Sequence, residues 1–408
     1  MQKIPELLAP AGNLEKVRVA LAFGADAIYC GVPAFSLRAR ENSFSLADLR
    51  QARLLTRTAG KKIYLTVNIF PRNSDLCRLK NFLQKIDTIG FDAIIFSDAG
   101  VWRLLREFCP KTKLHLSVQA NSVNAESVKF WLKHDVRRVV LGRELSLREI
   151  ATICKEVPRM EFEVFVQGAI CVAYSGRCLL SQFLTNRDAN RGMCTQPCRW
   201  KYQLVEEKRP NELLPIEEDV HGSYILNSKD LCLIEKIPQL ARAGVTALKI
   251  EGRHKSIGYL ATVTRAYRNA LDDFAARKKF NSQLLDEIAT TGNRGFTFGF
   301  FDGTQRDLQN FKRSASENPQ TFLGLVEKVY NDCALLKPRN RFKVGDLIEV
   351  VPPNSGIFKF KVTEIFDEDS ASLRVVHGGQ NSKVWVKLSK QQLTKILPFT
   401  LFRKCYQK

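Results

Sequence analysis

Short apolar runs alternate with longer amphipathic stretches through the first 277 residues of the chain. The runs are rich in Val, Ile, Leu and Ala, a pattern typical of parallel strands that are buried on both faces. The stretches between them have helical spacing, and the first begins at a good capping residue, Asn13. Eight strands are expected, at residues 6–9, 27–31, 62–68, 93–96, 113–118, 138–141, 161–166 and 247–250.

Eight strand–helix units in about 270 residues match the size of a (β/α)8 barrel of the TIM type. A doubly wound open sheet is the main alternative, because a count of strands does not show that the sheet closes. We expect the barrel, since a parallel sheet of eight strands can close around a filled interior. This α/β barrel domain is predicted to span residues 1–277.

The C-terminal part of the chain has a different pattern. Residues 278–320 are polar and mixed, and we interpret them as a bridging segment. From residue 321 to residue 408, short strand patterns recur, with turn residues such as Gly378 and Gly379 between them. Strands at this spacing predict a small β-barrel domain.

The chain is strongly basic, with a formal net charge of +21. Residues 1–308 carry 46 Lys and Arg against 33 Asp and Glu, and residues 309–408 carry 17 against 9, so the excess is spread out. Such a surface favours a polyanion partner, RNA or DNA, although a basic bias of the whole proteome is the alternative. No apolar run is long enough to span a membrane, and no signal peptide is visible, so a cytoplasmic protein is expected.

The most informative feature is a cysteine-bearing insertion, residues 168–228, which follows the seventh predicted strand. A loop of about sixty residues in a compact domain is usually functional, and barrel enzymes carry their chemistry on the loops that follow the strands. Cys232 comes just after the insertion. It lies near the predicted start of a helix that Ser228 or Asp230 would cap, and a helix N-terminus stabilises a thiolate. The insertion itself contains Cys171, Cys178, Cys194 and Cys198.

Clustered cysteines in a chain expected in the cytoplasm indicate a metal or redox site and not a disulfide framework. The spacing C-x6-C-x15-C-x3-C-x33-C contains no C-x2-C pair. It therefore fits an iron–sulfur cluster, which needs converging thiolates, better than a structural zinc site. A cysteine peptidase is a further alternative, with His254 on the loop after the eighth strand as the candidate general base.

Charged side chains also follow other predicted strands. Arg143 follows the sixth strand, and Glu251 and Arg253 follow the eighth. We expect these residues to be catalytic and to bind a small anion, because arginine forks bind carboxylates and phosphates bidentately. The alternative is a structural ion pair of Glu251 with Arg253 or Arg143 across the mouth of the barrel.

At these residues the chain resembles the collagenase-like peptidase family of unassigned catalytic type. The resemblance lies in EVFVQGAIC at residues 163–171 and YSGRCLLS at residues 174–181. It continues in PELLAPAG at 5–12, ADAIYCG at 25–31, CTQPCRWKY at 194–202, NSKDLC at 227–232, KIEGRHKS at 249–256 and FKVGDLIEV at 342–350, and so covers nearly the whole chain. Within the family, YSGRCLLS with NRDANRGMC at 186–194 looks most like the tRNA hydroxylation proteins. Ribosomal RNA and ubiquinone hydroxylation proteins are sister groups.

The resemblance implies an oxygen-independent hydroxylase that depends on an iron–sulfur cluster of the [4Fe-4S] type. The tRNA group converts the wobble uridine to 5-hydroxyuridine and requires prephenate, so the anticodon region of tRNA is the implied partner and a small carboxylate an implied ligand. Carried over by motif, the cluster ligands are Cys171, Cys178, Cys194 and Cys232, with Cys198 as the alternative fourth ligand. We expect a flipped-out uridine to meet the cysteine loop at the barrel mouth. A peptidase, a ribosomal RNA hydroxylase and an RNA-binding protein with structural zinc are the alternatives.

Overall fold

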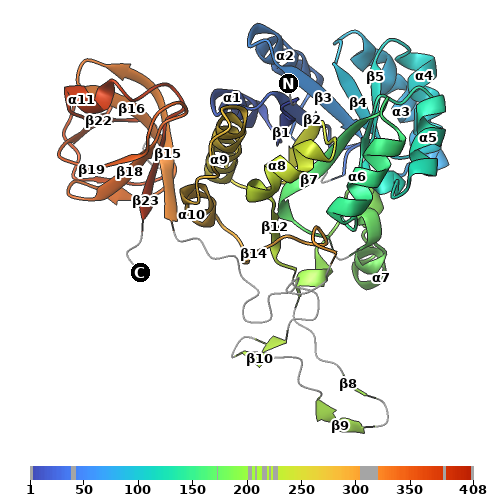
Figure 1. Cartoon of the computed structure of the whole chain (residues 1–408). Coiled ribbons are helices and arrows are strands. Elements are labelled where there is room, and N and C mark those ends of the chain that lie inside the picture. Colours follow the sequence, from blue (N-terminus) through green and yellow to red (C-terminus); the bar gives the residue numbers. More distant parts are fainter. Residues whose placement is uncertain are drawn as a thin grey trace.

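The computed structural model describes residues 3–37, 43–171, 173–200, 205–206, 209–213, 218–219, 222–223, 228–303, 320–379 and 383–405. Figure 1 shows an α/β barrel with a β-domain beside it. No helix in these ranges is long and apolar enough to cross a membrane.

Eight parallel strands form a closed barrel. Consecutive strands pair in chain order, and β13 pairs with both β7 and β1, which closes the sheet. The predicted (β/α)8 barrel is thus confirmed, and the doubly wound sheet was the wrong alternative. The strands are β1 (Glu6–Pro10), β2 (Ala27–Gly31), β3 (Lys62–Val67), β4 (Ala93–Phe96), β5 (Lys113–Leu116), β6 (Arg138–Val140), β7 (Glu161–Ala169) and β13 (Ala247–Ile250).

Helices cover the outside of this sheet (Figure 1). Their starts follow the capping chemistry of the sequence: Asn13 Oδ1 accepts the Lys16 N–H at 2.9 Å, and Ser45 and Ser146 form capping boxes. The helices are α1 (Leu14–Ala22), α2 (Leu46–Thr58), α3 (Asn73–Asp87), α4 (Ala99–Phe108), α5 (Ala125–Lys133), α6 (Leu147–Glu156), α8 (Ile237–Arg242) and α9 (Ile257–Ala275).

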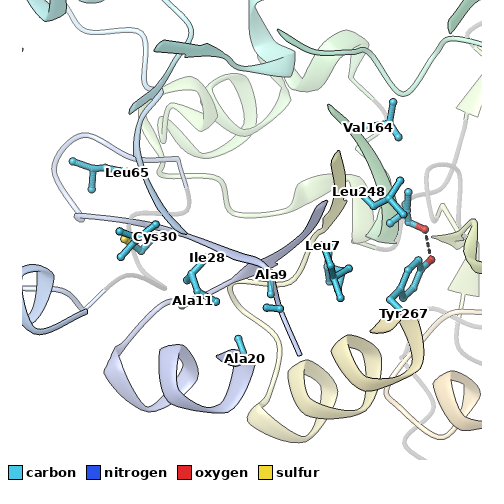
Figure 2. Close-up of a cluster of buried hydrophobic side chains, with 14 of the residues drawn as sticks. Leu7, Ala9, Ala11, Ala20, Ile28, Cys30, Leu65, Val164, Leu248 and Tyr267 are labelled. Carbon is cyan, nitrogen blue, oxygen red and sulfur yellow. Dashed lines mark hydrogen bonds between the residues drawn. The ribbon is translucent and has the colours of Figure 1, made fainter. Parts of the chain in front are cut away.

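Alternate residues of each strand face two different layers, because side chains alternate across a strand. In β1, Leu7 and Ala9 belong to the large cluster between strands and helices, where Figure 2 shows Ala9 close to Ala20 of α1. Leu8, between them, belongs to a small cluster with Tyr29 and Ala93. The apolar core therefore lies mainly outside the barrel wall.

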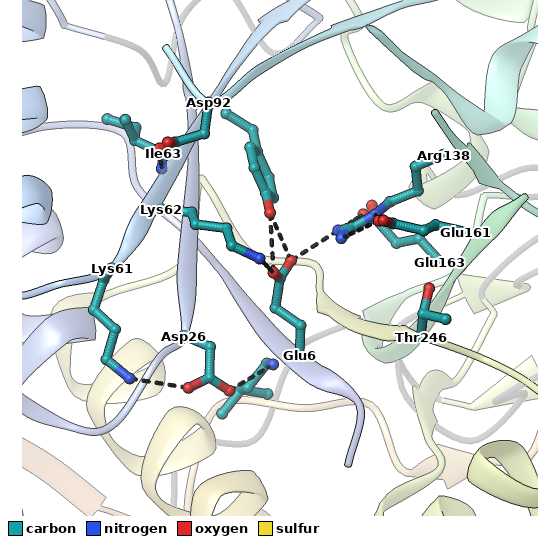
Figure 3. Close-up of polar contacts among 12 residues, drawn as sticks. Glu6, Asp26, Lys61, Lys62, Ile63, Asp92, Arg138, Glu161, Glu163 and Thr246 are labelled. Atoms are coloured by element: carbon teal, nitrogen blue, oxygen red, sulfur yellow. Dashed lines mark hydrogen bonds and ion pairs between the residues drawn. The ribbon is translucent and has the colours of Figure 1, made fainter. Parts of the chain in front are cut away.

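Charged side chains occupy much of the barrel interior. Arg138 Nη1 donates to Glu6 Oε1 at 2.8 Å and to Glu163 Oε2 at 3.2 Å, and Lys249 Nζ lies 2.7 Å from Glu163 Oε1. Figure 3 shows Glu6 between Lys62 and Arg138. Burial alone would raise the pKa of Glu6, but Arg138 and Lys62 hold it below its ordinary value. The network satisfies these buried charges and fixes the inward side of β1, β6, β7 and β13.

The last residues of β7 carry two further strands outside the eight-stranded barrel. β12 (Asp230–Cys232) pairs antiparallel with β7, and β14 (Phe296–Thr297) pairs parallel with β12. Between β7 and β12, the structure describes η3 (Tyr174–Gly176), α7 (Leu180–Thr185), η4 (Ala189–Arg191), η5 (Pro197–Arg199), β8 (Val205–Glu206), β9 (Arg209–Leu213), β10 (Glu218–Asp219) and β11 (Gly222–Ser223).

The predicted β-domain is confirmed as a seven-stranded antiparallel sheet that forms a half-barrel around its own core. Sequence reasoning missed β23, which pairs with β15 and β18 and so lies inside the sheet. The bridging segment contains α10 (Gln283–Ala289), while residues 304–319 lie outside the described ranges. The domain contains β15 (Gln320–Tyr330), β16 (Cys333–Pro338), β17 (Phe342–Lys343), β18 (Leu347–Val351), β19 (Phe358–Lys361), β20 (Ile365–Phe366), β21 (Val375–Val376), β22 (Val384–Lys387), α11 (Lys390–Leu393) and β23 (Leu401–Cys405).

Candidate active site

A cavity lies at the C-terminal ends of the barrel strands, next to the cysteine-bearing insertion. The three residues predicted to be catalytic, Arg143, Glu251 and Arg253, line it. Four of the five candidate ligands line it as well, namely Cys171, Cys178, Cys194 and Cys198. The structure therefore brings together two groups of residues that the sequence singled out on separate grounds.

Gly168 allows β7 to pass close to the loop that carries Glu251. Its φ is +106°, and a Cβ at this position would lie 2.6 Å from the backbone oxygen of Glu251. Only glycine tolerates both this backbone conformation and this approach. Cys171 follows three residues later, so this contact helps to determine where the cysteine loop begins relative to Glu251.

Polar side chains at the ends of β5 and β6 hold the first turn of the insertion. The backbone N–H of Ser175 donates to Glu144 Oε1, and the Ser175 hydroxyl donates to Asn121 Oδ1 at 2.7 Å. Arg177 Nε donates to the backbone carbonyl of Gln119 at 2.7 Å. These bonds fix the turn that precedes Cys178, and Ser175 itself adopts a left-handed conformation with φ of 48°.

The second half of the insertion is tied to the first half and to the barrel. The amide of Asn190 bonds to the backbone of Cys178, and Arg191 Nη2 lies 2.8 Å from both carboxylate oxygens of Asp75 in α3. The Ser181 hydroxyl accepts the backbone N–H of Thr195 at 3.0 Å, which joins α7 to the loop of Cys194. The cysteine loops are therefore held by specific polar contacts.

The four cavity thiols are a suitable donor set for an iron–sulfur cluster, because such clusters are held by cysteine thiolates. The backbone N–H of Gln196 donates to Cys194 Sγ at 3.3 Å, and hydrogen bonds to sulfur are among the features that tune a cluster. Among the described residues, however, no three Cys, His, Asp or Glu side chains are close enough to hold one metal ion. The chemistry of the donor set fits a cluster, while its thiols are not gathered at one point.

Cys232 does not line the cavity that these four cysteines share. It ends β12 opposite Gln167 and lines a second cavity with Glu235 and Phe298. Burial raises the pKa of its thiol to about 11. The motif resemblance placed Cys232 with the other ligands, whereas here it faces a different cavity from Cys198.

The prediction of a helix start at Cys232 was wrong. Residues Asp230–Cys232 form a strand because the extended end of β7 offers an edge for pairing. Asp230 does not cap a helix; its side chain accepts from Arg294 Nη2 at 2.6 Å and lies 3.5 Å from Lys255 Nζ. The helix α8 begins only at Ile237, with a proline in its first turn.

Lys249 is a site residue that sequence reasoning missed. It lines the cavity from β13, and its Nζ lies 4.5 Å from the Tyr29 ring centroid. Burial lowers the pKa of Lys249, although the contact with Glu163 opposes this effect. The signal in the sequence was a lysine inside an otherwise apolar strand.

The predicted catalytic residues make different contacts. Arg253 Nη1 donates to Ser36 Oγ at 2.6 Å and to Thr66 Oγ1 at 3.2 Å, and its buried Nε has no hydrogen-bond partner among the described residues. Glu251 Oε2 accepts from the Tyr29 hydroxyl at 3.2 Å. The Arg143 guanidinium lies 3.8 Å from the ring centroid of Phe165. The cavity thus combines cationic groups, a carboxylate and aromatic faces, which suits an anionic ligand with a planar part.

The chain belongs to peptidase family U32. The model of this family matches residues 12–310, and the model of its C-terminal domain matches residues 318–397. The resemblance stated from the cysteine motifs is therefore confirmed.

Curated relatives cover most of the chain and have different names. The tRNA hydroxylation protein P of Escherichia coli is 42% identical over 395 residues, which is 86% of this chain and 87% of that protein. A collagenase of Porphyromonas gingivalis is 31% identical over 380 residues, covering 88% of this chain and 89% of that protein. The 23S rRNA 5-hydroxycytidine synthase of Escherichia coli is 32% identical over 349 residues, covering 82% of this chain and 51% of that protein.

Proposed function

We propose that this chain is an RNA-modifying enzyme that hydroxylates the wobble uridine of tRNA to 5-hydroxyuridine without molecular oxygen. The observation that carries the proposal is that four insertion cysteines share one cavity with Arg143, Lys249 and Glu251 at the barrel mouth. The 42% identity to tRNA hydroxylation protein P supports tRNA as the substrate. A net charge of +21 also suits a tRNA partner, because phosphate contacts dominate the affinity of RNA-binding proteins. We place the enzyme in the cytoplasm, where tRNA is modified.

We further propose that the cavity holds an iron–sulfur cluster of the [4Fe-4S] type. Cys171, Cys178 and Cys194 would supply three ligands. For the fourth, the motif resemblance favours Cys232, whereas Cys198 lines the same cavity as the other three. When bound, the cluster supplies one-electron redox chemistry. Iron content distinguishes the two cysteines: loss in Cys198→Ser with retention in Cys232→Ser assigns Cys198, and the opposite pattern assigns Cys232.

The protein side chains would position the reactants. Replacing the C5–H bond of uracil by C5–OH removes two electrons from the base, so the reaction needs both an oxygen source other than O2 and an acceptor for two electrons, and the protein side chains supply neither. Arg143 and Arg253 would hold an anionic co-substrate, prephenate or a related small carboxylate, by charge-assisted hydrogen bonds. Lys249 and Glu251 line the same cavity and can hold or move a proton beside the base. Tyr29 and Phe165 offer faces on which a flipped-out uracil can stack.

Metal analysis of the anaerobically purified protein separates the proposal from its alternatives. Iron with acid-labile sulfide supports the hydroxylase, zinc supports an RNA-binding protein with a structural metal, and absence of both metals supports the peptidase named by the collagenase relative. An activity assay with each RNA then distinguishes a tRNA hydroxylase from a ribosomal RNA hydroxylase. Ribosomal RNA is the substrate in the name of the synthase relative. If anticodon RNA is hydroxylated equally well after the cluster has been removed, the proposed role of the cluster is wrong.

A further inference from the structure

We propose that outward-facing apolar side chains around the cavity form a stacking surface for unpaired RNA bases. We call this surface the rim, and it consists of Tyr174, Leu179, Phe183, Leu184, Met193 and Trp200. The inference rests on the proposed function and identifies the surface on which that site would receive its substrate.

Apolar exposure is concentrated at the rim. Six of the fifteen exposed large hydrophobic side chains of the described residues lie between Tyr174 and Trp200. Phe183 is 86% exposed and Leu179 is 74% exposed, the two highest values among the fifteen. Soluble proteins expose large apolar side chains singly, so a concentration in one short segment indicates an interaction surface.

The outward position of Phe183 follows from the way α7 is fixed. Ser181 and Thr185, one turn apart, both lie within hydrogen-bond distance of Thr195 Oγ1, at 3.1 Å and 3.2 Å. These contacts turn the polar side of α7 toward the loop that carries Cys194. Phe183 and Leu184 are consequently left on the exposed side.

The rim residues alternate along the chain with residues that line the cavity. Cys178 and Leu180 line the cavity on either side of exposed Leu179, and Cys194 follows exposed Met193. The rim is therefore the outer surface of the same loops whose inner surface forms the site. A macromolecule bound on the rim has a part of itself next to the cavity.

Charge and aromatic content favour RNA as the occupant. Residues 173–200 contain four arginines against one aspartate, so the segment attracts a polyanion. Half of the rim residues, Tyr174, Phe183 and Trp200, are aromatic, and unpaired bases stack on such rings without sequence preference. A protein partner or a second copy of this chain on the same surface would obstruct the cavity for a macromolecular substrate.

Substitutions of Phe183 test the rim with two labelled RNAs, a stem–loop with an unpaired loop and a blunt duplex of equal nucleotide number. Phe183→Ala should weaken stem–loop binding by about tenfold, since stacking contributes about 1–3 kcal/mol per base. Duplex binding should stay within about twofold, because no phosphate contact is lost. Phe183→Tyr should bind like the wild type, whereas Phe183→Leu should bind like the alanine variant.

Two matched controls are Leu54→Ala on α2 and Tyr330→Ala on β15, because both residues are exposed at more than 60% and lie outside the insertion. They should leave both dissociation constants unchanged, and all variants should keep the iron content of the wild type. The rim is refuted if Phe183→Ala binds the stem–loop normally, if Phe183→Leu binds like the wild type, or if Phe183→Ala converts a wild-type dimer to monomers. If the wild type binds neither RNA, the proposed function itself fails together with the rim.

Discussion

The side-chain amide of Asn190 bonds to the backbone of Cys178 in both directions. Its Oδ1 accepts the Cys178 N–H at 3.2 Å, and its Nδ2 donates to the Cys178 carbonyl at 3.0 Å. The carbonyl of Asn190 also accepts the backbone N–H of Phe70 at 3.1 Å, just beyond β3. One residue therefore ties the cysteine loop to the second half of the insertion and to the barrel.

Asn190→Ala should lower the iron content of the purified protein, because it frees both backbone groups of Cys178 and leaves the loop less ordered. Two lost hydrogen bonds correspond to about 1–3 kcal/mol of local stability. Asn281→Ala is the control, since Asn281 also accepts a backbone N–H, at 3.0 Å, but lies at the start of α10. Equal iron content in the two variants would show that Asn190 does not position Cys178.

Serine substitution of Cys171, Cys178 or Cys194 should abolish most of the bound iron and sulfide, since an alcohol is a poor replacement for a thiolate ligand. Cys77→Ser is the matched control, because Cys77 is exposed on α3. Circular dichroism should show that every variant is folded. Iron retained in any one of the three would remove that cysteine from the ligand set.

Gly168→Ala should destabilise the fold by about 3 kcal/mol or more, because the new Cβ would meet the backbone oxygen of Glu251 at 2.6 Å. Gly90→Ala isolates the effect of backbone conformation: φ is +72° there, and no atom lies within 4 Å of the added Cβ. That control should cost about 1 kcal/mol. Chemical denaturation measures both values, and equal losses would show that the close approach at Gly168 has no energetic role.

Stability should fall as the pH drops below 6.5, and His115 should account for part of the loss. Burial, together with Arg138 and Lys249, lowers the pKa of His115 far below 6.5, so the folded chain keeps this ring neutral. The unfolded chain binds a proton there below pH 6.5, and linkage then favours unfolding by at most about 1.4 kcal/mol per pH unit. His115→Phe should reduce the slope between pH 7 and about pH 5. His134→Phe, at the C-terminal end of α5, is the control for replacing a histidine outside the barrel interior.

Much of the fold could be predicted because the barrel strands have a strong local signal. Residues Ala247–Ile250 are apolar except for Lys249 and close the barrel, and the expected strand at 247–250 coincides with β13. β23 has the same kind of apolar start at Leu401 and Phe402, but its place between β15 and β18 depends on long-range pairing. Long-range pairing also determines the structure at Cys232, because its strand forms only where β7 extends beyond the barrel.

The candidate site was predictable where residues follow a strand end and not where they face the barrel interior. Arg143, Glu251 and Arg253 were found because the loops after parallel strands meet at one edge. Lys249 was missed because a strand pattern alone does not show which positions face a closed interior. The exposed side chain of Phe183 was not predictable either, since it results from the contacts of α7 with Thr195.

The central claim is most directly tested by nucleoside mass spectrometry of tRNA from a strain that lacks this gene and has no second route to the modification. Our account predicts that 5-hydroxyuridine and its derivatives disappear, that the wild-type gene restores them, and that the Cys171→Ser gene does not. Unchanged levels of these nucleosides in the deletion strain would contradict the account.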